Sequence, residues 1–334
     1  MKVIVAHGGQ NPADAGAFSE EERTIPHAEG RDILVKIQAA AVNPVDTKVF
    51  ERMPADAARI LGWDACGIVE AVGPKGTKFK PGDRVYYAGD LTRDGSNAEY
   101  QLVDERLVGP APVSLAVAQA ASLPLTTLTA WEGLFDRLGF AAAEGANAGM
   151  TLLVIGGAGG VGSMIIQLAR WAGMTVIATA GRPDSAQWCR DLGASAVIGR
   201  DNLAERLTAE GISSVDAIYC TTHLEEHWQA MSQVIAPQGR ICMIDDPDAA
   251  LDIRVFKQKS VRLCWEFMYT RSMFKTADMD RQGMILETVS RLIDAGRVRT
   301  TLAKTIEGLS AESVQAAHLQ QRTGKMVGKQ VIVF

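Results

Sequence analysis

The sequence predicts an α/β protein with two domains, one rich in β-strands and one built on a parallel sheet. At 334 residues, the chain exceeds the size at which a single hydrophobic core stops growing, so two domains are expected. Residues 1 to about 123 contain short alternating segments separated by Gly and Pro turns, which is typical of β-rich structure. From residue 151 onward, apolar strands alternate with helical segments, and this βαβ succession predicts a parallel sheet with helices on both faces.

The β-rich region is predicted to contain five strands. They are Lys2–Ala6, Ile33–Ala41, Gly67–Val72, Arg84–Tyr87 and Ala98–Val103. Two prolines, Pro110 and Pro112, then mark a link between domains. The spacing of apolar residues from Leu115 to Leu138 is helical and is broken around Pro124.

A glycine-rich turn between a strand and a helix is the most informative motif in the chain. An apolar run from Leu152 to Gly156 predicts a buried parallel strand, and helical spacing follows the turn. Gly157, Gly159 and Gly162 satisfy G-x-G-x-x-G. In this motif the first glycine permits a sharp turn, the second lets the backbone approach a pyrophosphate, and the third lets the helix pack closely on the strand. The unpaired amides at the start of the helix favour bound phosphates. The sequence therefore predicts a dinucleotide site formed by Gly157, Ala158, Gly159, Gly160, Val161 and Gly162.

Strands and helices alternate after the glycine turn. The predicted strands are Thr175–Ala180, Ala196–Ile198, Val215–Cys220, Arg240–Ile244 and Val261–Phe267, and the predicted helices are Ser185–Leu192, Leu203–Ala209 and Glu225–Ile235. The tail is mixed, with helices Met279–Ala295 and Ala311–Gln321 and a last strand Gln330–Phe334. This order suggests that the tail returns to complete the first domain.

The residues after the second strand of the parallel sheet favour NADPH over NADH. An NAD site is expected to place Asp or Glu about 20 residues past the glycine turn, where this chain has Ala180, Gly181 and Arg182. Gly181 leaves room for a phosphate and Arg182 can pair with it, while Arg200 after the third strand could contact the same phosphate or the adenine. Asp184 could read a hydroxyl but more naturally caps the next helix.

Composition and charge exclude several classes of partner. The net charge is -5 and no Lys/Arg block is present, which argues against nucleic acid and anionic membranes. No apolar run approaches 18 residues, and the N-terminal one is too short for a signal peptide, so a cytoplasmic protein is expected. The five cysteines are widely separated without C-x-x-C, so they predict neither a disulfide framework nor structural zinc.

Several further motifs occur together in a recognisable order. They are residues 43–48 (NPVDTK), 61–69 (LGWDACGIV), 81–85 (PGDRV) and 128–131 (LTAW), followed by the glycine turn. With these motifs the whole chain resembles the medium-chain dehydrogenase/reductase superfamily, in particular its zinc-free quinone oxidoreductase branch. The resemblance implies a GroES-like catalytic domain (residues 1–123 and 270–334), a Rossmann domain (residues 124–269) and an active site in the cleft between them. It also implies a homodimer, in which the edge strand Val261–Phe267 pairs with its symmetry mate.

The resemblance also implies the absence of catalytic zinc. Zinc-dependent alcohol dehydrogenases of this superfamily carry a Cys where Asn43 stands, a His-Glu pair where Trp63 and Asp64 stand, and another Cys near Leu125. Indole and leucine side chains cannot coordinate Zn²⁺. His223 and His227 are four residues apart and could share a helix face, but they lack a third ligand.

The remaining site residues are assigned from the resemblance and from their chemistry. Asn43 is expected to donate a hydrogen bond to a developing oxyanion, Asp46 to orient a neighbour or hold the loop, and Lys48 to supply a proton or positive charge unless it is a surface lysine. Thr129 resembles a threonine that lies against the nicotinamide, and Cys220 and Ile244 follow strand ends where ligands bind in open α/β sheets. The substrate pocket is expected to include Phe50, Trp63, Leu125 and Tyr269, with Tyr269 a candidate acid.

These assignments predict a zinc-independent, NADPH-dependent oxidoreductase that transfers hydride to a quinone or another activated carbonyl or alkene. Without a metal, the small-molecule acceptor should already be electrophilic. Two alternatives remain. One is an NADPH-binding sensor or structural protein with little turnover. The other is an enoyl-thioester reductase, which would need a basic entrance for the carrier phosphates, and no such cluster is evident.

Overall fold

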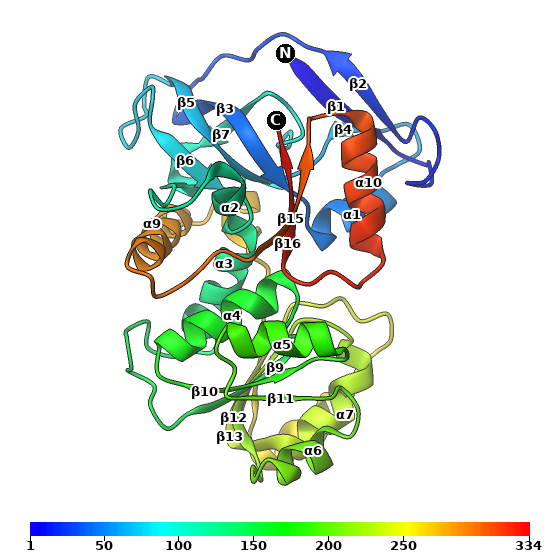
Figure 1. The fold of residues 1–334 in the computed structure, drawn as a ribbon, viewed down its shortest axis with the longest axis vertical. Helices are drawn as coiled ribbons and strands as arrows, with labels where there is room; N and C mark the ends of the chain where they lie inside the picture. Colours follow the sequence, from blue (N-terminus) through cyan, green and yellow to red (C-terminus); the bar gives the residue numbers. More distant parts are fainter. The chain divides into compact units, whose positions relative to one another are not determined.

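The computed structural model describes residues 1–334 and divides the chain into two compact units. Unit 1 comprises Met1–Leu128 and Tyr269–Phe334, and unit 2 comprises Thr129–Met268 (Figure 1). The expected domain boundaries, after residues 123 and 269, differ from these by five residues and one residue. Both ends of the chain therefore belong to unit 1.

Unit 1 is built on a seven-stranded sheet with the path β15-β16-β3-β5-β6-β8, and β7 also pairs with β3. Its strands are β3 (Asp32–Ala41), β5 (Asp64–Val72), β6 (Arg84–Tyr87), β7 (Tyr100–Asp104), β8 (Val108–Pro110), β15 (Leu302–Glu307) and β16 (Lys329–Val333). The last strand, β16, pairs antiparallel with β3 and parallel with β15. The tail of the chain thus lies inside the sheet, where alternate residues of β3, such as Ile33 and Val35, fill the core.

A smaller antiparallel sheet and short helices complete unit 1. The sheet has the order β2-β1-β4, and its strands are β1 (Lys2–His7), β2 (Phe18–Glu22) and β4 (Ala58–Ile60). The helices are α1 (Pro44–Glu51), α2 (Val117–Ala121), α3 (Pro124–Trp131, whose last three residues belong to unit 2), α8 (Thr270–Met273), α9 (Arg281–Asp294) and α10 (Ala311–Arg322). The predicted helical stretch is broken before Pro124 because proline is tolerated in the first turn of a helix but not in its interior.

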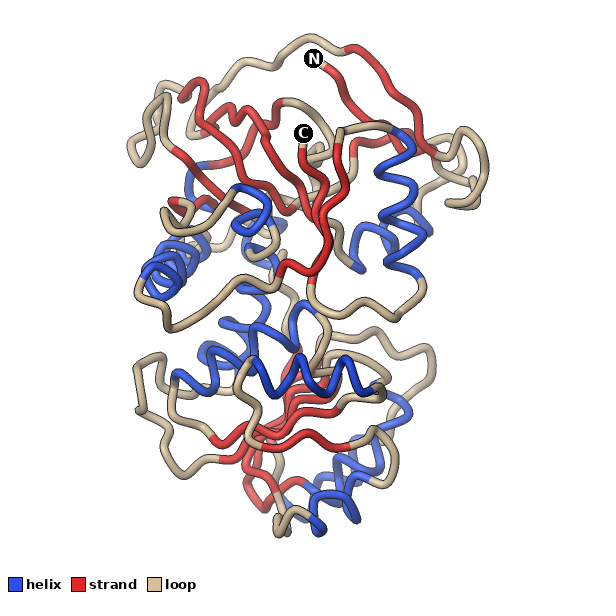
Figure 2. Tube along the Cα trace, viewed as in Figure 1, coloured by secondary structure: helices blue, strands red, loops and turns tan.

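Unit 2 contains a six-stranded, fully parallel sheet with the order β11-β10-β9-β12-β13-β14. Its strands are β9 (Thr151–Ile155), β10 (Thr175–Thr179), β11 (Ala196–Ile198), β12 (Val215–Cys220), β13 (Ile235–Met243) and β14 (Arg262–Trp265). Its helices are α4 (Gly160–Trp171), α5 (Pro183–Asp191), α6 (Leu203–Ala209) and α7 (Leu224–Val234), with a π-helical segment at Glu132–Arg137 and a 3-10 helix at Ile253–Lys259. Figures 1 and 2 show α4 and α5 on one face of the sheet and α6 and α7 on the other. The predicted α/β fold class is confirmed.

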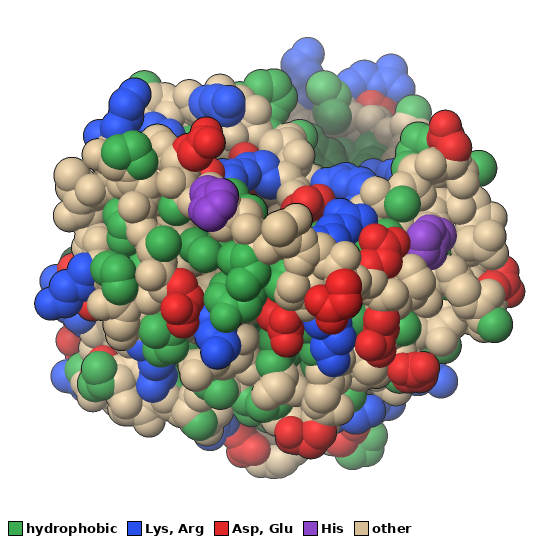
Figure 3. Space-filling model, turned by 90° about the horizontal axis from the view of Figure 1, so that it is seen from above, with side chains coloured by type: hydrophobic (Ala, Val, Ile, Leu, Met, Phe, Trp, Pro, Cys, Tyr) green, Lys and Arg blue, Asp and Glu red, His purple; other side chains and the backbone are tan.

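The surface carries charges of both signs. On the face shown in Figure 3, acidic and basic side chains are interspersed with hydrophobic ones. None of the helices combines the length and the apolar character that are needed to span a bilayer.

Candidate functional site

The glycine turn joins β9 to α4, and its strained position is Gly156. The φ angle of Gly156 is +85°, and a Cβ there would lie 2.3 Å from Thr221 Oγ1. Gly157, which was expected to permit the turn, has no positive φ. It must be glycine for another reason, because a Cβ on Gly157 would lie 2.7 Å from the Cβ of Ala178. The positive φ that the turn requires is therefore at Gly156, one residue before the G-x-G-x-x-G motif begins.

The second and third glycines of the motif differ in how much space surrounds them. A Cβ at Gly162 would lie 2.2 Å from the carbonyl oxygen of Gly156, so only glycine lets α4 pack this closely on the turn. A Cβ at Gly159 would meet nothing nearer than 3.7 Å. Gly159 caps α4, which begins at Gly160, and the first amides of a helix have no partner within it. The space beside Gly159 is therefore suited to an anion at the helix N-terminus.

A cavity of about 540 Å³ lies beyond the carboxyl ends of β10 and β11. Ala180, Gly181 and Arg200 line it. A Cβ on Gly181 would lie 3.1 Å from Nε of Arg200, so the absence of a side chain at Gly181 lets the guanidinium group lie against the backbone there. The cavity combines an exposed cation with a glycine backbone, as a phosphate site requires.

The arginines near this cavity are not equivalent. Arg182 does not line the cavity, and its Nε lies 3.2 Å from Asp184 Oδ1. Arg206 lines it but is paired with both carboxylate oxygens of Asp201, at 2.8 and 2.9 Å. Arg200 makes no contact with a carboxylate, and its Nη1 lies 3.5 Å from Nε2 of His223. Arg200, rather than Arg182, is therefore the guanidinium group that can accept an anion without giving up an ion pair.

The other cofactor-site residues of unit 2 lie around the ends of β12 and β13. The carbonyl oxygen of Thr129 accepts a hydrogen bond from the hydroxyl of Tyr219 at 2.7 Å. The amide of Ile244 donates to the carbonyl oxygen of Cys220 at 3.3 Å. Burial raises the pKa of the Cys220 thiol to about 12, so this thiol is not a nucleophile at neutral pH. These positions offer mainly backbone groups to a ligand.

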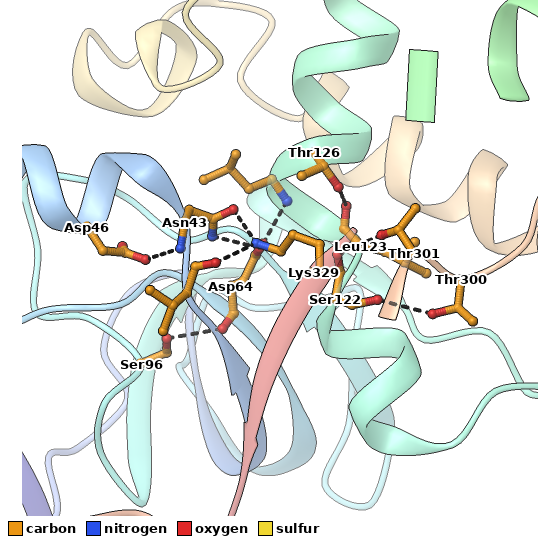
Figure 4. Close-up of polar contacts among 12 residues, drawn as sticks. Asn43, Asp46, Asp64, Ser96, Ser122, Leu123, Thr126, Thr300, Thr301 and Lys329 are labelled. Carbon is orange, nitrogen blue, oxygen red and sulfur yellow. Dashed lines mark hydrogen bonds and ion pairs between the residues drawn. The ribbon is translucent and has the colours of Figure 1, made fainter. Parts of the chain in front are cut away.

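Unit 1 contains a buried polar network centred on Asp64, which is shown in Figure 4. One Asp64 oxygen, Oδ1, accepts the amide hydrogen of Leu125 at 2.7 Å. The other, Oδ2, accepts from Asn43 Nδ2 at 2.8 Å and from Lys329 Nζ at 3.3 Å. Lys329 also donates to the side-chain oxygen of Asn43 and, at 2.9 Å, to the carbonyl oxygen of Val42. Strands β5 and β16, helix α3 and the start of α1 therefore meet in one closed set of hydrogen bonds.

Burial and ion pairing have opposite effects on the pKa values of Asp64 and Lys329. Burial raises the pKa of Asp64, and the Lys329 ammonium group and the hydrogen bonds from Asn43 and Leu125 act against that rise. Burial lowers the pKa of Lys329, and the carboxylates of Asp64 and Asp46 act against that fall. Lys329 was not among the site residues predicted from the sequence. The available signal was a lysine directly before the apolar run Gln330–Phe334, where a charge would have to be paired in a core strand.

Asp46 lies on helix α1, which was not predicted. Its Oδ2 accepts the backbone amide hydrogen of Asn43, the N-cap residue, at 2.6 Å. Burial raises the pKa of Asp46 to about 7, although the Asn43 hydrogen bond and Lys329 lower it. Asp46 therefore holds the start of a helix rather than a loop. Lys48, on the same helix, is half-buried and is not part of the Asp64 network.

Two of the residues predicted for the substrate pocket, Trp63 and Tyr269, are in contact in the structure, whereas Phe50 lies in a different cluster. Trp63 donates from Nε1 to the carbonyl oxygen of Asp90 at 3.1 Å, and its ring lies edge-on to that of Tyr269, with centroids 6.3 Å apart. Burial, with the negative charges of Asp46 and Asp64, raises the pKa of Tyr269 well above its usual range. Tyr269 is thus a weak acid in this environment.

Phe50 belongs to a different cluster from Trp63 and Tyr269. Its ring stacks on Phe18 with centroids 5.1 Å apart and lies edge-on to His318 at 6.2 Å. These three side chains fill the space between α1, β2 and α10. The location of Phe50 is explained by core packing within unit 1.

Comparison with known proteins identifies both halves of the chain. Residues 29–113 match the alcohol dehydrogenase GroES-like domain, and residues 160–281 match the zinc-binding dehydrogenase family. A zinc-type alcohol dehydrogenase-like protein of Staphylococcus aureus is 40% identical over 333 residues, 99% of each chain. An NADPH-dependent alkenal/one oxidoreductase of Arabidopsis thaliana is 36% identical over 190 residues, which are 54% of this chain and 47% of that protein.

Solved structures share the whole fold. A Rhizobium etli protein, provisionally described as a zinc-dependent alcohol dehydrogenase, is 45% identical, with a TM-score of 0.95 over 100% of this chain and 98% of that one. A quinone oxidoreductase of Escherichia coli, solved with NADPH, is 22% identical, with a TM-score of 0.84 over 100% of both chains. This second likeness concerns the fold alone.

Zinc, which several of these names imply, does not fit the residues at the expected positions. Both carboxylate oxygens of Asp64 already accept hydrogen bonds, and the Lys329 ammonium group adds a positive charge where a metal cation would have to bind. The Trp63 indole offers no ligand atom, and no three His, Cys, Asp or Glu side chains are grouped so that they could hold a metal ion.

The fold, the motifs and the relatives agree. Unit 1 contains the residues that match the GroES-like domain, and unit 2 contains the glycine turn on a parallel sheet of Rossmann type. A relative that is 40% identical over 99% of the chain places the whole sequence in the same family. This chain is a member of the medium-chain dehydrogenase/reductase superfamily of oxidoreductases.

Proposed function

We propose that this chain is a zinc-independent, NADPH-dependent oxidoreductase that reduces a quinone or another activated carbonyl or alkene. The observation that carries the proposal is the ammonium group of Lys329, buried against Asp64 and Asn43 at the positions that hold zinc ligands in related dehydrogenases. A carbonyl that cannot be polarised by a metal must already be electrophilic to accept hydride.

The residues of unit 2 fit NADPH. The proposed pyrophosphate site is the open space at Gly159 and the N-terminus of α4, and the proposed 2'-phosphate site is formed by Gly181 and Arg200. Thr129 and the backbone at Cys220 and Ile244 are assigned to the nicotinamide half. NADPH, when bound, supplies the hydride. The relative that is named an NADPH-dependent alkenal/one oxidoreductase supports both the cofactor and the acceptor class.

The residues of unit 1 orient the acceptor in this proposal. The Nδ2 group of Asn43 has two hydrogens, one of which is used by Asp64, and we assign the second to the acceptor oxygen. Asp46 positions Asn43 through its backbone amide. Trp63, Leu125 and Tyr269 are assigned to the acceptor pocket. Lys48 is retained as the proton source, because the raised pKa of Tyr269 makes its hydroxyl a poor donor.

A panel of acceptors tests this function. Quinones, enones and an enoyl thioester are mixed with the protein and NADPH or NADH, and the nicotinamide absorbance is followed. Oxidation of NADPH by quinones or enones is expected, whereas preference for the enoyl thioester would favour that alternative. Metal analysis of the purified protein accompanies the assay, and tightly held stoichiometric zinc would overturn the zinc-independent proposal.

The second candidate function is an NADPH-binding sensor. One observation favours it. Asp64, Asn43 and Lys329 are hydrogen-bonded to one another, so neither ionisable group of this network, Asp64 or Lys329, is without a partner and ready to act as an acid or base. Tight NADPH binding without oxidation by any acceptor would support the sensor and contradict the reductase.

We also propose a cytoplasmic homodimer formed through β14. This strand is at the edge of its sheet, and the large side chains of Trp265 and Phe267 nearby are 50% and 46% exposed. Sedimentation should give twice the chain mass of 35.8 kDa, and cell fractionation tests the location. A monomer at micromolar concentration would contradict the dimer.

A further inference from the structure

Two reduced cysteines lie side by side on the last two strands of the parallel sheet. Cys242 of β13 and Cys264 of β14 are direct partners in the register of these strands. Neighbouring strands are about 4.8 Å apart, which lies within the range of Cα separations that a disulfide spans. The Sγ atom of Cys264 lies 3.3 Å from the carbonyl oxygen of Ile241, at the peptide group that leads into Cys242. The backbone spacing therefore permits a disulfide between the two side chains.

The two thiols differ in their access to solvent. Strand β14 is at the edge of the sheet, and Cys264 is partly exposed there, whereas Cys242 is 0% exposed. Leu263 packs against the hydrophobic core, and because side chains alternate along a strand, Cys264 points to the opposite face. A small oxidant in solution can reach Cys264 but not Cys242, so Cys264 is the thiol that reacts first.

Arginine side chains lie near Cys264. Arg262 is two residues earlier on β14 and shares its face. Nε of Arg137 lies 2.8 Å from Oε2 of Glu266, which is two residues after Cys264. A hydrogen bond with Cys242 lowers the pKa of Cys264; burial opposes this change, and the positive charges of Arg137 and Arg262 support it. Because the thiolate is the nucleophilic form of cysteine, these neighbours favour reaction at Cys264.

The other cysteines have the opposite environment. Burial raises the pKa of the Cys66, Cys189 and Cys220 thiols to about 12. Burial also raises the pKa of Cys242 well above its usual range. All four are buried, so Cys264 is the one cysteine that combines exposure with a lowered pKa. Oxidation should therefore be selective among the five cysteines of the chain.

We propose that Cys264 is a peroxide-reactive thiol and that Cys242 is the cysteine that resolves its oxidised form into a disulfide. The Cys264 thiolate attacks hydrogen peroxide, an S–O bond forms, the O–O bond breaks, and the leaving hydroxide takes up a proton to become water. The sulfur of Cys242 then attacks the sulfur of the sulfenic acid, and the Cys242 proton leaves with the hydroxyl group as a second water. Two thiols lose two electrons in total, and one peroxide is reduced to two waters.

This reaction requires neither NADPH nor an acceptor, so it is independent of the proposed function. In the proposed homodimer, Cys264 lies on the strand that meets its symmetry mate. A disulfide between the Cys264 residues of two copies is therefore the competing product, and the test must distinguish it from the disulfide within one chain.

The test begins with the wild-type full-length protein and a small excess of hydrogen peroxide. Thiols are titrated after denaturation, disulfide-linked peptides are mapped, and the chain mass is followed by non-reducing electrophoresis. The protein should lose two of its five thiols, give a linked Cys242–Cys264 peptide and run as a single chain, and dithiothreitol should restore both thiols. A covalent dimer linked through Cys264, or earlier oxidation of any other cysteine, would overturn the proposal.

Single variants separate the two roles. Cys242→Ser should leave Cys264 as a sulfenic acid that dimedone captures, and Cys264→Ser should lose no thiol. The matched control is Cys189→Ser, which removes a buried thiol elsewhere in unit 2 and should form the Cys242–Cys264 disulfide at the wild-type rate. Thiol loss in Cys264→Ser as fast as in wild type would contradict the assignment of the reactive cysteine.

A charge variant tests why Cys264 reacts. Arg262 is exposed, so Arg262→Gln should fold normally and slow the reaction with peroxide by about two- to fivefold, the effect of one exposed charge. The slowing should shrink at high salt, because salt screens the charge. A rate that is equal to that of wild type at low salt would show that the arginine does not activate the thiol.

Discussion

Two polar sites in this chain differ in how their hydrogen bonds are satisfied. In unit 1, Asn43, Asp64 and Lys329 are buried and bond to one another. In unit 2, Arg200 has no carboxylate partner. Open space also surrounds Gly159 at the start of α4.

The difference separates groups that hold the fold from groups that are available to a ligand. The buried Asp64–Lys329 pair has its hydrogen bonds made, and the site offers a ligand little beyond the second Nδ2 hydrogen of Asn43. Removing one member of the pair leaves the other charge buried, at a large desolvation cost. An exposed group without a partner in the chain, such as Arg200, can exchange water for a ligand without giving up a hydrogen bond within the protein. Substitutions in the first site should therefore cost folding stability, and substitutions in the second should cost cofactor affinity.

The largest expected effect is on stability, from Lys329→Met. This change leaves the buried Asp64 carboxylate without its cation, which typically costs about 3–5 kcal/mol. Urea unfolding followed by circular dichroism measures it. The matched control is the double variant Lys329→Met with Asp64→Asn, in which both charges are removed and an amide oxygen remains to accept the hydrogen of the Leu125 amide, so that much of the stability should return. A single variant as stable as wild type would show that the network does not hold unit 1 together.

Two glycines of the same turn, Gly159 and Gly162, allow the comparison to be made within four residues. Gly159→Ala places a methyl group in open space, so the unfolding midpoint should stay unchanged while NADPH binding falls by about 100-fold, or about 2.7 kcal/mol. Gly162→Ala places it 2.2 Å from the carbonyl oxygen of Gly156, and overpacking of this kind costs about 1–3 kcal/mol of stability. Thermal unfolding and cofactor titration of both variants check the contrast. Equal behaviour of the two variants would contradict it.

Two arginines should contribute unequally to cofactor choice. Arg200→Ala should raise the Kd of NADPH by about 10- to 100-fold and leave that of NADH unchanged, since hydrogen bonds to charged groups contribute about 1.5–3 kcal/mol. Arg182→Ala was expected from the sequence to have this effect. Because Arg182 contacts Asp184 and lies outside the cavity, we now expect Arg182→Ala to raise the Kd of NADPH less than Arg200→Ala does. A larger loss in Arg182→Ala than in Arg200→Ala would reverse the assignment.

The smallest expected effect concerns the pH dependence of stability. Asp46 has a pKa of about 7 in the folded chain and 3.8 as an ordinary carboxyl, so the folded state binds more protons than the unfolded state above pH 4. The contribution of Asp46 to the free energy of unfolding therefore falls as the pH rises from about 4 to 7 and then levels off. Asp46→Asn keeps an acceptor for the Asn43 amide but cannot titrate.

Urea unfolding at several pH values measures this effect. Between pH 6 and pH 8, wild type should lose about 1 kcal/mol relative to Asp46→Asn. Parallel pH profiles of the two proteins would contradict the raised pKa.

Local patterns predicted the elements that have clear boundaries in the sequence. Strands Arg84–Tyr87, Ala196–Ile198 and Val215–Cys220 and helix Leu203–Ala209 have the predicted bounds, because an apolar period ends there at a turn. Helix α1 was missed because Asn43 and Pro44 were interpreted as part of a loop. The same residues are a helix N-cap and a proline in the first turn, and a longer apolar face would have been needed to distinguish the two.

The sequence by itself determined the fold class, the family, the glycine turn, and the replacement of the expected zinc ligands by Asn43, Trp63 and Leu125. Only the tertiary structure brought Lys329 next to Asn43, which lies 286 positions earlier in the chain. It also distinguished Arg200, which lines the cavity, from Arg182, which contacts Asp184. The reason is physical. Helix and strand periods are local, whereas the partners of a buried charge depend on which strands pair, and the insertion of β16 between β3 and β15 is decided by the packing of the whole sheet.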